Sequence, residues 1–271
     1  MGGLFLLPKG YPPGQNYRVI CFFCVFLNNP HPNMKNSYFT FKQFSLNDQG
    51  ATMKIGTDGV LLGAWCSLKN PSRILDIGTG SGLIALMLAQ RTASHVTIHG
   101  LDIEKENVYV ATKNVNASPW KSRIKIIHSS LQQFLPPQPY DLVVSNPPFF
   151  SKSLLPEKTS RLVSRHTEFL SHEALAQHTL RLLSPTGTFQ VILPSAEGQA
   201  FINICRKEGF YCIRKCAFST RKEKPVSRFL LAFSRLLEPL DENNLYLYEK
   251  ENVWSEDYFS LTKAFYTRIH P

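Results

Sequence analysis

Short apolar runs alternate along most of this chain with longer segments in which apolar residues recur every three or four positions. Runs rich in β-branched residues are typical of buried strands, and the longer period is typical of helices. The predicted strands are residues 73–77, 96–101, 124–128 and 141–145. The predicted helices between them are residues 83–90 and 104–116. Strands that alternate with helices at this spacing form parallel βαβ units, so we predict an α/β fold with a doubly wound, mostly parallel sheet.

The second half of the chain continues this alternation and then departs from it. Helical patterns at residues 170–183 and 196–207 flank a strand pattern at 188–193. Two further strand patterns, 211–218 and 228–233, follow with no helical pattern between them. Consecutive strands without a crossover helix pair antiparallel, so we predict a terminal antiparallel hairpin on the sheet.

Two patterns precede the alternating region. Ser37 to Leu46 alternates aromatic and polar residues, which predicts a strand. Residues 58–68 (DGVLLGAWCSL) predict a short buried helix with Asp58 as its N-cap. We assign no element to residues 240–271.

The first 33 residues differ from the rest. They hold five prolines and only two charged residues, and their one apolar run, residues 19–27, is short. A membrane-spanning helix needs about 20 apolar residues, and a signal peptide has its apolar region close behind a basic one. We expect Met34 to be the native start, with residues 1–33 an irregular upstream extension and residues 34–271 a single domain.

The chain is basic, with 30 Lys and Arg against 20 Asp and Glu and a formal net charge of +10. Such an excess favours a polyanionic partner, above all a nucleic acid. Among six cysteines, only Cys21 and Cys24 form a C-x-x-C pair, and Cys212 with Cys216 is a weak second pair for zinc. We therefore predict no metal site, no membrane association, no obligate protein partner and a cytoplasmic location.

Three glycines follow the strand at 73–77 at every second position. Gly78, Gly80 and Gly82 remove Cβ atoms where a backbone must approach a ligand or adopt a positive φ. A dinucleotide fingerprint needs G-x-G-x-x-G, and Leu83 occupies its third glycine position. The observed spacing, D-x-G-x-G-x-G, resembles the loop of class I S-adenosylmethionine (SAM) methyltransferases.

The strand ends supply further candidate cofactor contacts. Asp102 can accept hydrogen bonds from both ribose hydroxyls, and it can also cap the helix that starts near Glu104. Asp76 would lie under the glycine loop and face the methionine amino group. Ser130 stands where the adenine of SAM usually meets an acidic residue. The predicted cofactor-binding residues are Asp76, Gly78, Thr79, Gly80, Gly82, Asp102, Ser130 and Asn146.

The strand at 141–145 ends in Asn146-Pro147-Pro148-Phe149. The prolines fix φ and keep the preceding residue extended, which makes a stiff platform. The sequence resembles the N-P-P-aromatic motif of SAM-dependent amino methyltransferases. We predict Asn146, Pro147 and Phe149 as catalytic residues, because two carbonyl oxygens can accept the hydrogens of a conjugated amine while the aromatic ring stacks on its planar group.

Over about residues 34–271, the chain resembles the bacterial tRNA1(Val) adenine-N6 methyltransferases. Besides the two motifs, the match includes residues 39–65, SRHT at 164–167 and RFLLAF at 228–233. The resemblance implies a class I methyltransferase domain with SAM as cofactor and tRNA as partner, acting on N6 of the adenosine 3′ of the anticodon of valine tRNA. It also implies that Lys54 to Asp58 lie near the site entrance and that Arg165 and His166 lie on the substrate side.

The motifs leave other substrates open. An N-P-P enzyme can act on base amines of ribosomal RNA or on a release-factor glutamine, and a non-catalytic SAM-binding RNA chaperone is a further alternative. Residues 204–228 concentrate basic side chains, among which we predict Arg221 and Lys222 to bind tRNA phosphates; a solvated strand edge guarded by lysines is the competing interpretation. The residues of this basic cluster are Lys207, Arg214, Lys215, Arg221, Lys222, Lys224 and Arg228.

Overall fold

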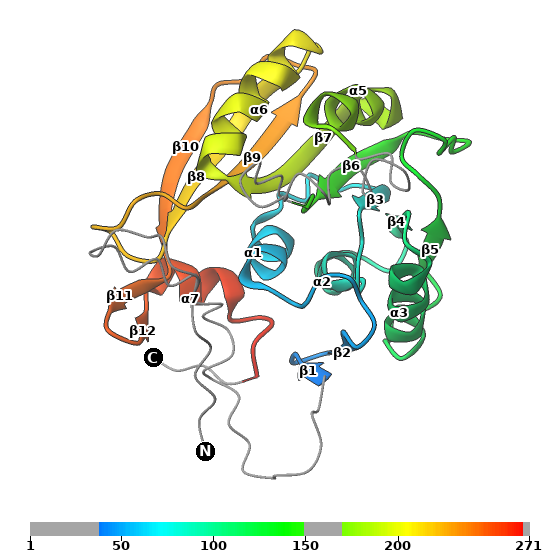
Figure 1. The fold of residues 1–271 in the computed structure, drawn as a ribbon, viewed down its shortest axis with the longest axis horizontal. Coiled ribbons are helices and arrows are strands. Elements are labelled where there is room, and N and C mark those ends of the chain that lie inside the picture. The colour runs from blue at the N-terminus through cyan, green and yellow to red at the C-terminus, as the bar shows by residue number, and fades with distance from the viewer. Residues whose placement is uncertain (1–37, 149–169, 268–271) are drawn as a thin grey trace, which may run out of the picture. The chain divides into compact units, whose positions relative to one another are not determined.

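The computed structural model describes residues 38–148 and 170–267, and eight of the strands in these ranges form one sheet. These strands are β3 (Arg73–Ile77), β4 (Thr97–Asp102), β5 (Ile124–His128), β6 (Tyr140–Ser145), β7 (Leu183–Pro194), β8 (Tyr211–Ser219), β9 (Arg228–Ser234) and β10 (Asp241–Tyr246). Their order is β10-β8-β9-β7-β6-β3-β4-β5 (Figure 1). The prediction of a doubly wound sheet is confirmed.

The strands from β7 through β6, β3 and β4 to β5 are parallel to one another. The predicted antiparallel hairpin is also present, because β9 runs antiparallel to both β8 and β7. The structure adds β10, which pairs with β8 in parallel at the sheet edge. Asp241 and Glu242 in this strand form ion pairs with Arg214 and Lys215 of β8, at 3.3 and 2.7 Å. β10 lacks the alternation of apolar and polar residues that is usual in a strand, so these ion pairs hold it at the edge of the sheet.

Helices cover both faces of the sheet. The longer helices of the described residues are α1 (Thr57–Trp65), α2 (Leu83–Arg91), α3 (Lys105–Asn116), α5 (His172–Leu182) and α6 (Ser195–Lys207). Figure 1 shows α1, α2 and α3 on one side of the sheet and α5 and α6 on the other. None of the described helices is both long and apolar enough to cross a membrane.

The region before α1 differs from the prediction in two ways. The expected single strand is a hairpin of β1 (Tyr38–Thr40) and β2 (Ser45–Asn47), because Phe41 and Phe44 at its turn are both buried and stack at 4.7 Å between ring centroids. The N-cap of α1 is Gly56, so the prediction of Asp58 as the cap is wrong. Asp58 lies inside the first turn, and its carboxylate accepts a hydrogen bond from Arg228 Nε at 2.9 Å.

The end of the chain packs against the region around α1. After β10 come the short strands β11 (Tyr248–Lys250) and β12 (Val253–Trp254) and the helix α7 (Glu256–Thr262). The Trp254 ring lies 5.1 Å from that of buried Tyr258 and 5.3 Å from that of Tyr266. Tyr266 in turn forms an isolated β-bridge with Phe41. The tail therefore fixes the β1–β2 hairpin in place.

Candidate active site

The carboxyl ends of β3, β4 and β6 meet at one edge of the sheet. The register pairs Ile77 with Leu101 on one side and with Ser145 on the other. Ser145 Oγ also donates a hydrogen bond to the Ile77 carbonyl at 3.0 Å. Gly78 and Asn146 follow directly after paired residues, and neighbouring strands lie about 4.8 Å apart. The glycine loop and the N-P-P motif are therefore adjacent.

All three loop glycines have positive φ, as the sequence predicted: 69° at Gly78, 56° at Gly80 and 84° at Gly82. A Cβ atom on Gly78 would meet no atom within 4 Å, and one on Gly80 would meet only the Gly78 carbonyl oxygen, at 4.0 Å. These two glycines face open space that a ligand can fill. A Cβ on Gly82 would instead contact Ala111 of α3, at 3.5 Å.

Asp76 lies fully buried beneath this loop. Its Oδ2 accepts hydrogen bonds from Thr79 Oγ1 at 2.7 Å and from the Ala85 backbone N–H at 3.2 Å. Its buried Oδ1 accepts none within the described residues. Burial raises the pKa of Asp76 to about 7, against the lowering effect of those two hydrogen bonds. A buried carboxylate oxygen with no partner is a suitable acceptor for a ligand ammonium group.

Asp102 connects the loop to the start of α3. Its Oδ2 accepts a hydrogen bond from the Gly80 backbone N–H at 2.8 Å. Its Oδ1 accepts from the Glu104 backbone N–H at 3.0 Å and from Asn107 Nδ2 at 3.1 Å. A carboxylate has about four acceptor positions, so about one remains for a ribose hydroxyl. Asp102 thus positions the loop, and it has room for one ribose hydroxyl where the sequence predicts contacts with both.

Asn107 was not among the predicted site residues. Besides its bond to Asp102, its Nδ2 donates to Thr52 Oγ1 at 3.0 Å. Its Oδ1 accepts from the Thr52 backbone N–H at 2.9 Å and from Thr52 Oγ1 at 3.2 Å. The segment before α1 is thereby tied to the carboxylate that holds the glycine loop.

Asn114, two turns along α3, forms a second tie of the same kind. Its Nδ2 donates to the carbonyl of Ser81 at 2.8 Å and to that of Asn47 at 2.9 Å, and its Oδ1 accepts from the Asn47 N–H at 2.9 Å. Asn107 and Asn114 lie on the buried face of α3 with Val110 and Ala111. Asparagines at i and i+7 within an apolar stripe are the signal that could have identified them.

The other predicted residues lie in different surroundings. Lys54 Nζ forms an ion pair with Asp48 Oδ1 at 3.2 Å, although its side chain is 68% exposed. Buried Ser130 accepts a hydrogen bond through Oγ from the Gln133 N–H at 3.3 Å. Arg221 and exposed Lys222 lie in the loop between β8 and β9. That loop leaves the same edge of the sheet as Asn146, on the far side of β7.

The N-P-P motif is described only as far as Pro148. Asn146 Oδ1 is buried and accepts no hydrogen bond in the described part of the chain. Pro147 is buried as well. Phe149, Arg165 and His166 lie outside the described residues. Within the described ranges, no three His, Cys, Asp or Glu side chains group in a way that could hold a metal ion.

These features fit SAM. The open space beside Gly78 and Gly80 can admit it, Asp76 Oδ1 can accept a hydrogen bond from its ammonium group, and Asp102 can contact its ribose. Asn146 Oδ1, a buried acceptor without a partner among the described residues, follows the strand next to this loop.

Comparisons with known proteins agree with this geometry. A family model described as the methyltransferase small domain matches residues 56–194. A tRNA1(Val) (adenine(37)-N6)-methyltransferase of Tolumonas auensis is 40% identical, over 85% of this chain and 97% of that protein. One of the same description from Trichodesmium erythraeum is 40% identical, over 87% of this chain and all of that protein. The crystal structure of a predicted O-methyltransferase from Agrobacterium tumefaciens shares the fold, with a TM-score of 0.62, 14% identity and coverage of 79% of this chain and 99% of that one.

The pKa of Asp76 predicts that SAM affinity depends on pH. The pKa of Asp76 is about 7 in the free protein, so below that pH its carboxyl group carries a proton. Asp76 must release this proton to pair with an ammonium group. We expect the Kd for SAM to fall, by up to about tenfold per pH unit, as the pH rises toward 7, and to rise again above about pH 8, where the ammonium group of SAM loses its own proton. Isothermal titration calorimetry in buffers of different ionisation enthalpy measures both the Kd and the proton release. Asp76→Asn should bind SAM weakly at every pH, and a pH-independent Kd in the unaltered protein would contradict the assignment.

Asn107 is predicted to support cofactor binding without touching the cofactor. Asn107→Leu removes the donor to Asp102 and leaves the Thr52 N–H without its acceptor. We expect the free energy of unfolding to fall by about 1–3 kcal/mol and the Kd for SAM to rise about tenfold. Asn116→Leu makes the same change on the exposed side of α3 and should alter neither quantity. Equal effects of the two substitutions would show that the hydrogen bonds of Asn107 make no specific contribution to stability or to SAM binding.

Proposed function

Because the chain belongs to the family of tRNA1(Val) (adenine(37)-N6)-methyltransferases, we propose that it methylates the exocyclic N6 of the adenosine 3′ of the anticodon in valine tRNA. The enzyme is a class I, SAM-dependent methyltransferase. A tRNA substrate implies that it works in the cytoplasm. The basic character of the chain, with a formal net charge of +10, supports an RNA partner.

The observation that carries this proposal is the position of Asn146. Its Oδ1 is a buried acceptor that no described residue uses, and it follows Ser145, which is paired with Ile77 at the start of the glycine loop. A buried acceptor without a partner is unfavourable, and an N–H of the reacting amine can satisfy it as the nitrogen becomes pyramidal in the transition state. An amine held there lies beside the cofactor.

The chemistry follows from the acceptors. Bound SAM supplies a methyl group on a positively charged sulfur. The adenine amine is a weak nucleophile because its lone pair is delocalised into the ring. Asn146 Oδ1 and the Pro147 carbonyl can each accept one of its N–H groups, which favours a pyramidal nitrogen with its lone pair directed at the methyl carbon. As the N–C bond forms, the bond between that carbon and the sulfonium sulfur would break, with its electron pair left on a neutral thioether sulfur. The nitrogen then releases one of its protons to solvent.

The remaining predicted residues belong to the substrate side in this proposal. Phe149 would stack on the adenine, which must leave its neighbours in the anticodon loop to enter the site. Unstacking costs less in a single-stranded loop than in a duplex. Arg165 and His166 would lie near the base, and Lys54 and Asp58 near the entrance. Arg221 and Lys222 would meet phosphates farther out. The roles of Lys54, Asp58, Arg165 and His166 rest on the family resemblance. Those of Arg221 and Lys222 rest on the clustering of basic residues at 204–228.

The first test is the transfer of radiolabelled methyl from SAM into total tRNA from cells that lack the modification, followed by nucleoside analysis. We expect label in N6-methyladenosine of valine tRNA. Label in ribosomal RNA, in another base, or in protein after RNase treatment would reject the proposed substrate while leaving the SAM site intact.

Replacement of Asn146 tests its role. For Asn146→Ala we expect kcat to fall by about two to three orders of magnitude, as for the loss of one polar group that stabilises a transition state, with tRNA binding changed less than twofold. Asn243→Ala, at an exposed position in β10, should leave kcat unchanged. A parallel loss of kcat and tRNA binding in Asn146→Ala would indicate that the residue only maintains the fold.

A further inference from the structure

A groove with a volume of about 1040 Å³ lies between the β1–β2 hairpin and α3. The hairpin contributes Phe41 and Phe44, whose rings stack at 4.7 Å between centroids. Phe44 also packs edge-on against Trp120, at 5.7 Å, in the loop after α3. This aromatic packing joins the two elements, so the groove is a built feature of the fold.

The groove is positively charged. Lys42, Lys113 and Lys121 line it, and none of the described residues that line it is an Asp or a Glu. Lys42 Nζ donates a hydrogen bond to the carbonyl of Lys263 at 2.7 Å, which orients its charge without neutralising it. Neither Lys113 nor Lys121 forms an ion pair within the described ranges. Three cations without a counter-charge favour a polyanionic occupant.

Two exposed aromatic rings also line the groove. Tyr38 is 62% exposed and Tyr109 is 61% exposed. The ammonium group of Lys113 lies 4.3 Å from the centroid of the Tyr109 ring. A cation and a flat ring at one place match a phosphate and a base of one nucleotide chain.

The groove adjoins the cofactor site. Asn114 lines it and also donates a hydrogen bond to the carbonyl of Ser81 in the glycine loop. The Asn114 side chain would therefore be all that separates an RNA strand in the groove from the loop that holds SAM.

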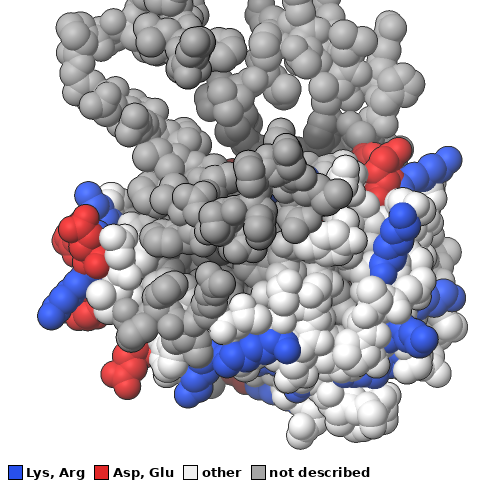
Figure 2. All heavy atoms as spheres, turned by 90° about the horizontal axis from the view of Figure 1, so that it is seen from below, with Lys and Arg blue, Asp and Glu red and all other residues white. Residues whose placement is uncertain are grey.

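The basic cluster of residues 204–228 is less available for phosphates. Arg214 and Lys215 form ion pairs with Asp241 and Glu242, and Arg228 forms one with Asp58. Figure 2 shows the side of the molecule that carries the hairpin and α3. Over its right half, Lys and Arg side chains lie among uncharged residues, while acidic side chains gather at its left edge and at one point at upper right.

From these observations we infer that the groove between the β1–β2 hairpin and α3 binds the sugar-phosphate backbone of the tRNA, away from the target adenine. The inference rests on the proposed function, because it takes tRNA as the substrate. Lys113 and Lys121 contact phosphates, and Tyr109 stacks on a base or ribose. The groove thus fixes the register of the RNA while the N-P-P motif receives the base.

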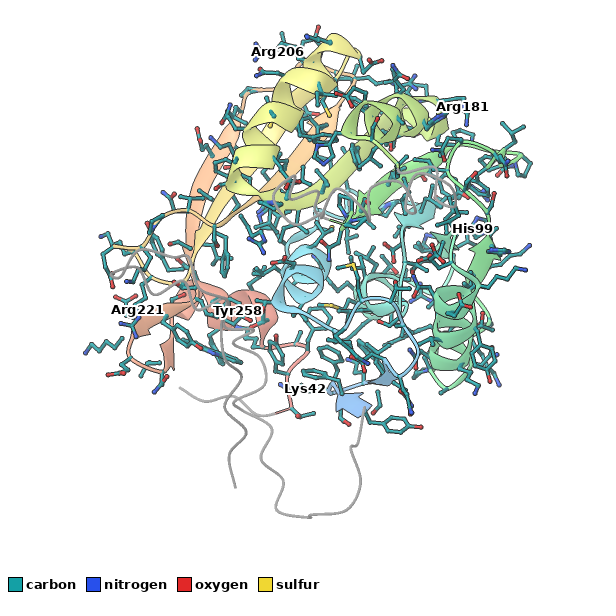
Figure 3. The ribbon with its side chains drawn as sticks, in the orientation of Figure 1. Lys42, His99, Arg181, Arg206, Arg221 and Tyr258 are labelled. Carbon is teal, nitrogen blue, oxygen red and sulfur yellow. The ribbon has the colours of Figure 1, made fainter. Side chains whose placement is uncertain are left out.

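The salt dependence of tRNA binding tests this inference. In the full-length double variant Lys113→Gln/Lys121→Gln, we expect the slope of log K against log salt to become shallower by about 1.4–1.8, for two lost phosphate contacts. At moderate salt the Kd for tRNA should rise about tenfold, with the Kd for SAM unchanged. The matched control is Arg181→Gln/Arg206→Gln, which removes two exposed charges at the end of the molecule opposite Lys42 (Figure 3).

The outcomes distinguish tRNA binding in the groove from attraction by net charge alone, and they distinguish this inference from the proposed function. An equal loss of tRNA affinity in both double variants would mean that net charge alone attracts tRNA. An unchanged salt slope in the lysine variant would mean that tRNA does not use the groove. Either result overturns the inference. Because binding is measured directly, absence of methyl transfer in the unaltered enzyme would reject the proposed function without deciding this test.

Substitutions of Tyr109 test the stacking contact. Tyr109→Phe keeps the ring and should bind tRNA as the unaltered protein does. Tyr109→Leu keeps an apolar side chain without the ring, and we expect its Kd for tRNA to rise several-fold, up to about tenfold. Equal affinity of the two variants would remove stacking from the proposed contact.

Discussion

The hydrogen bonds to the carboxylate of Asp102 hold the site together. This buried charge is stable because three N–H groups point at it, from Gly80, Glu104 and Asn107. Each donor belongs to a different part of the site: the glycine loop, the residue before α3, and the inner face of α3. These hydrogen bonds fix the loop in its positive-φ conformation, which lowers the ordering entropy that SAM binding costs.

The helix α3 connects this network to the outer surface. Asn107 and Asn114 on its buried face hold Thr52, Asn47 and the glycine loop, while Tyr109 and Lys113 line the groove on its other side. To make these contacts, α3 carries two polar residues within the apolar stripe of its buried face. Their burial is not destabilising, because every side-chain polar atom of both asparagines has a hydrogen-bond partner. The hairpin and the cofactor loop thus form one rigid frame.

The sequence predicts those parts of the structure that depend on neighbouring residues. The strands β3 to β9, the glycine loop and the position of Asn146 after β6 follow from local patterns, and the structure places them as expected. The ties formed by Asn107 and Asn114 join residues 33 to 67 positions apart, and no local pattern encodes such a pairing. The same reason explains the error at Asp58, whose carboxylate pairs with Arg228 across 170 positions, and the unpredicted β10, held by ion pairs to β8.

Acidic, neutral and basic groups lie in three different parts of the molecule, although the net charge of the chain is +10. Beneath the loop lie the carboxylates of Asp76 and Asp102, which suit a cofactor that carries an ammonium and a sulfonium group. Beside it Asn146 offers a neutral acceptor, which can hold an amine without protonating or trapping it. The cations lie outside, in the groove and in the loop after β8. In the proposed function, long-range attraction of RNA would therefore act at the surface, whereas the choice of reacting atom would depend on short-range hydrogen bonds in a site of opposite charge.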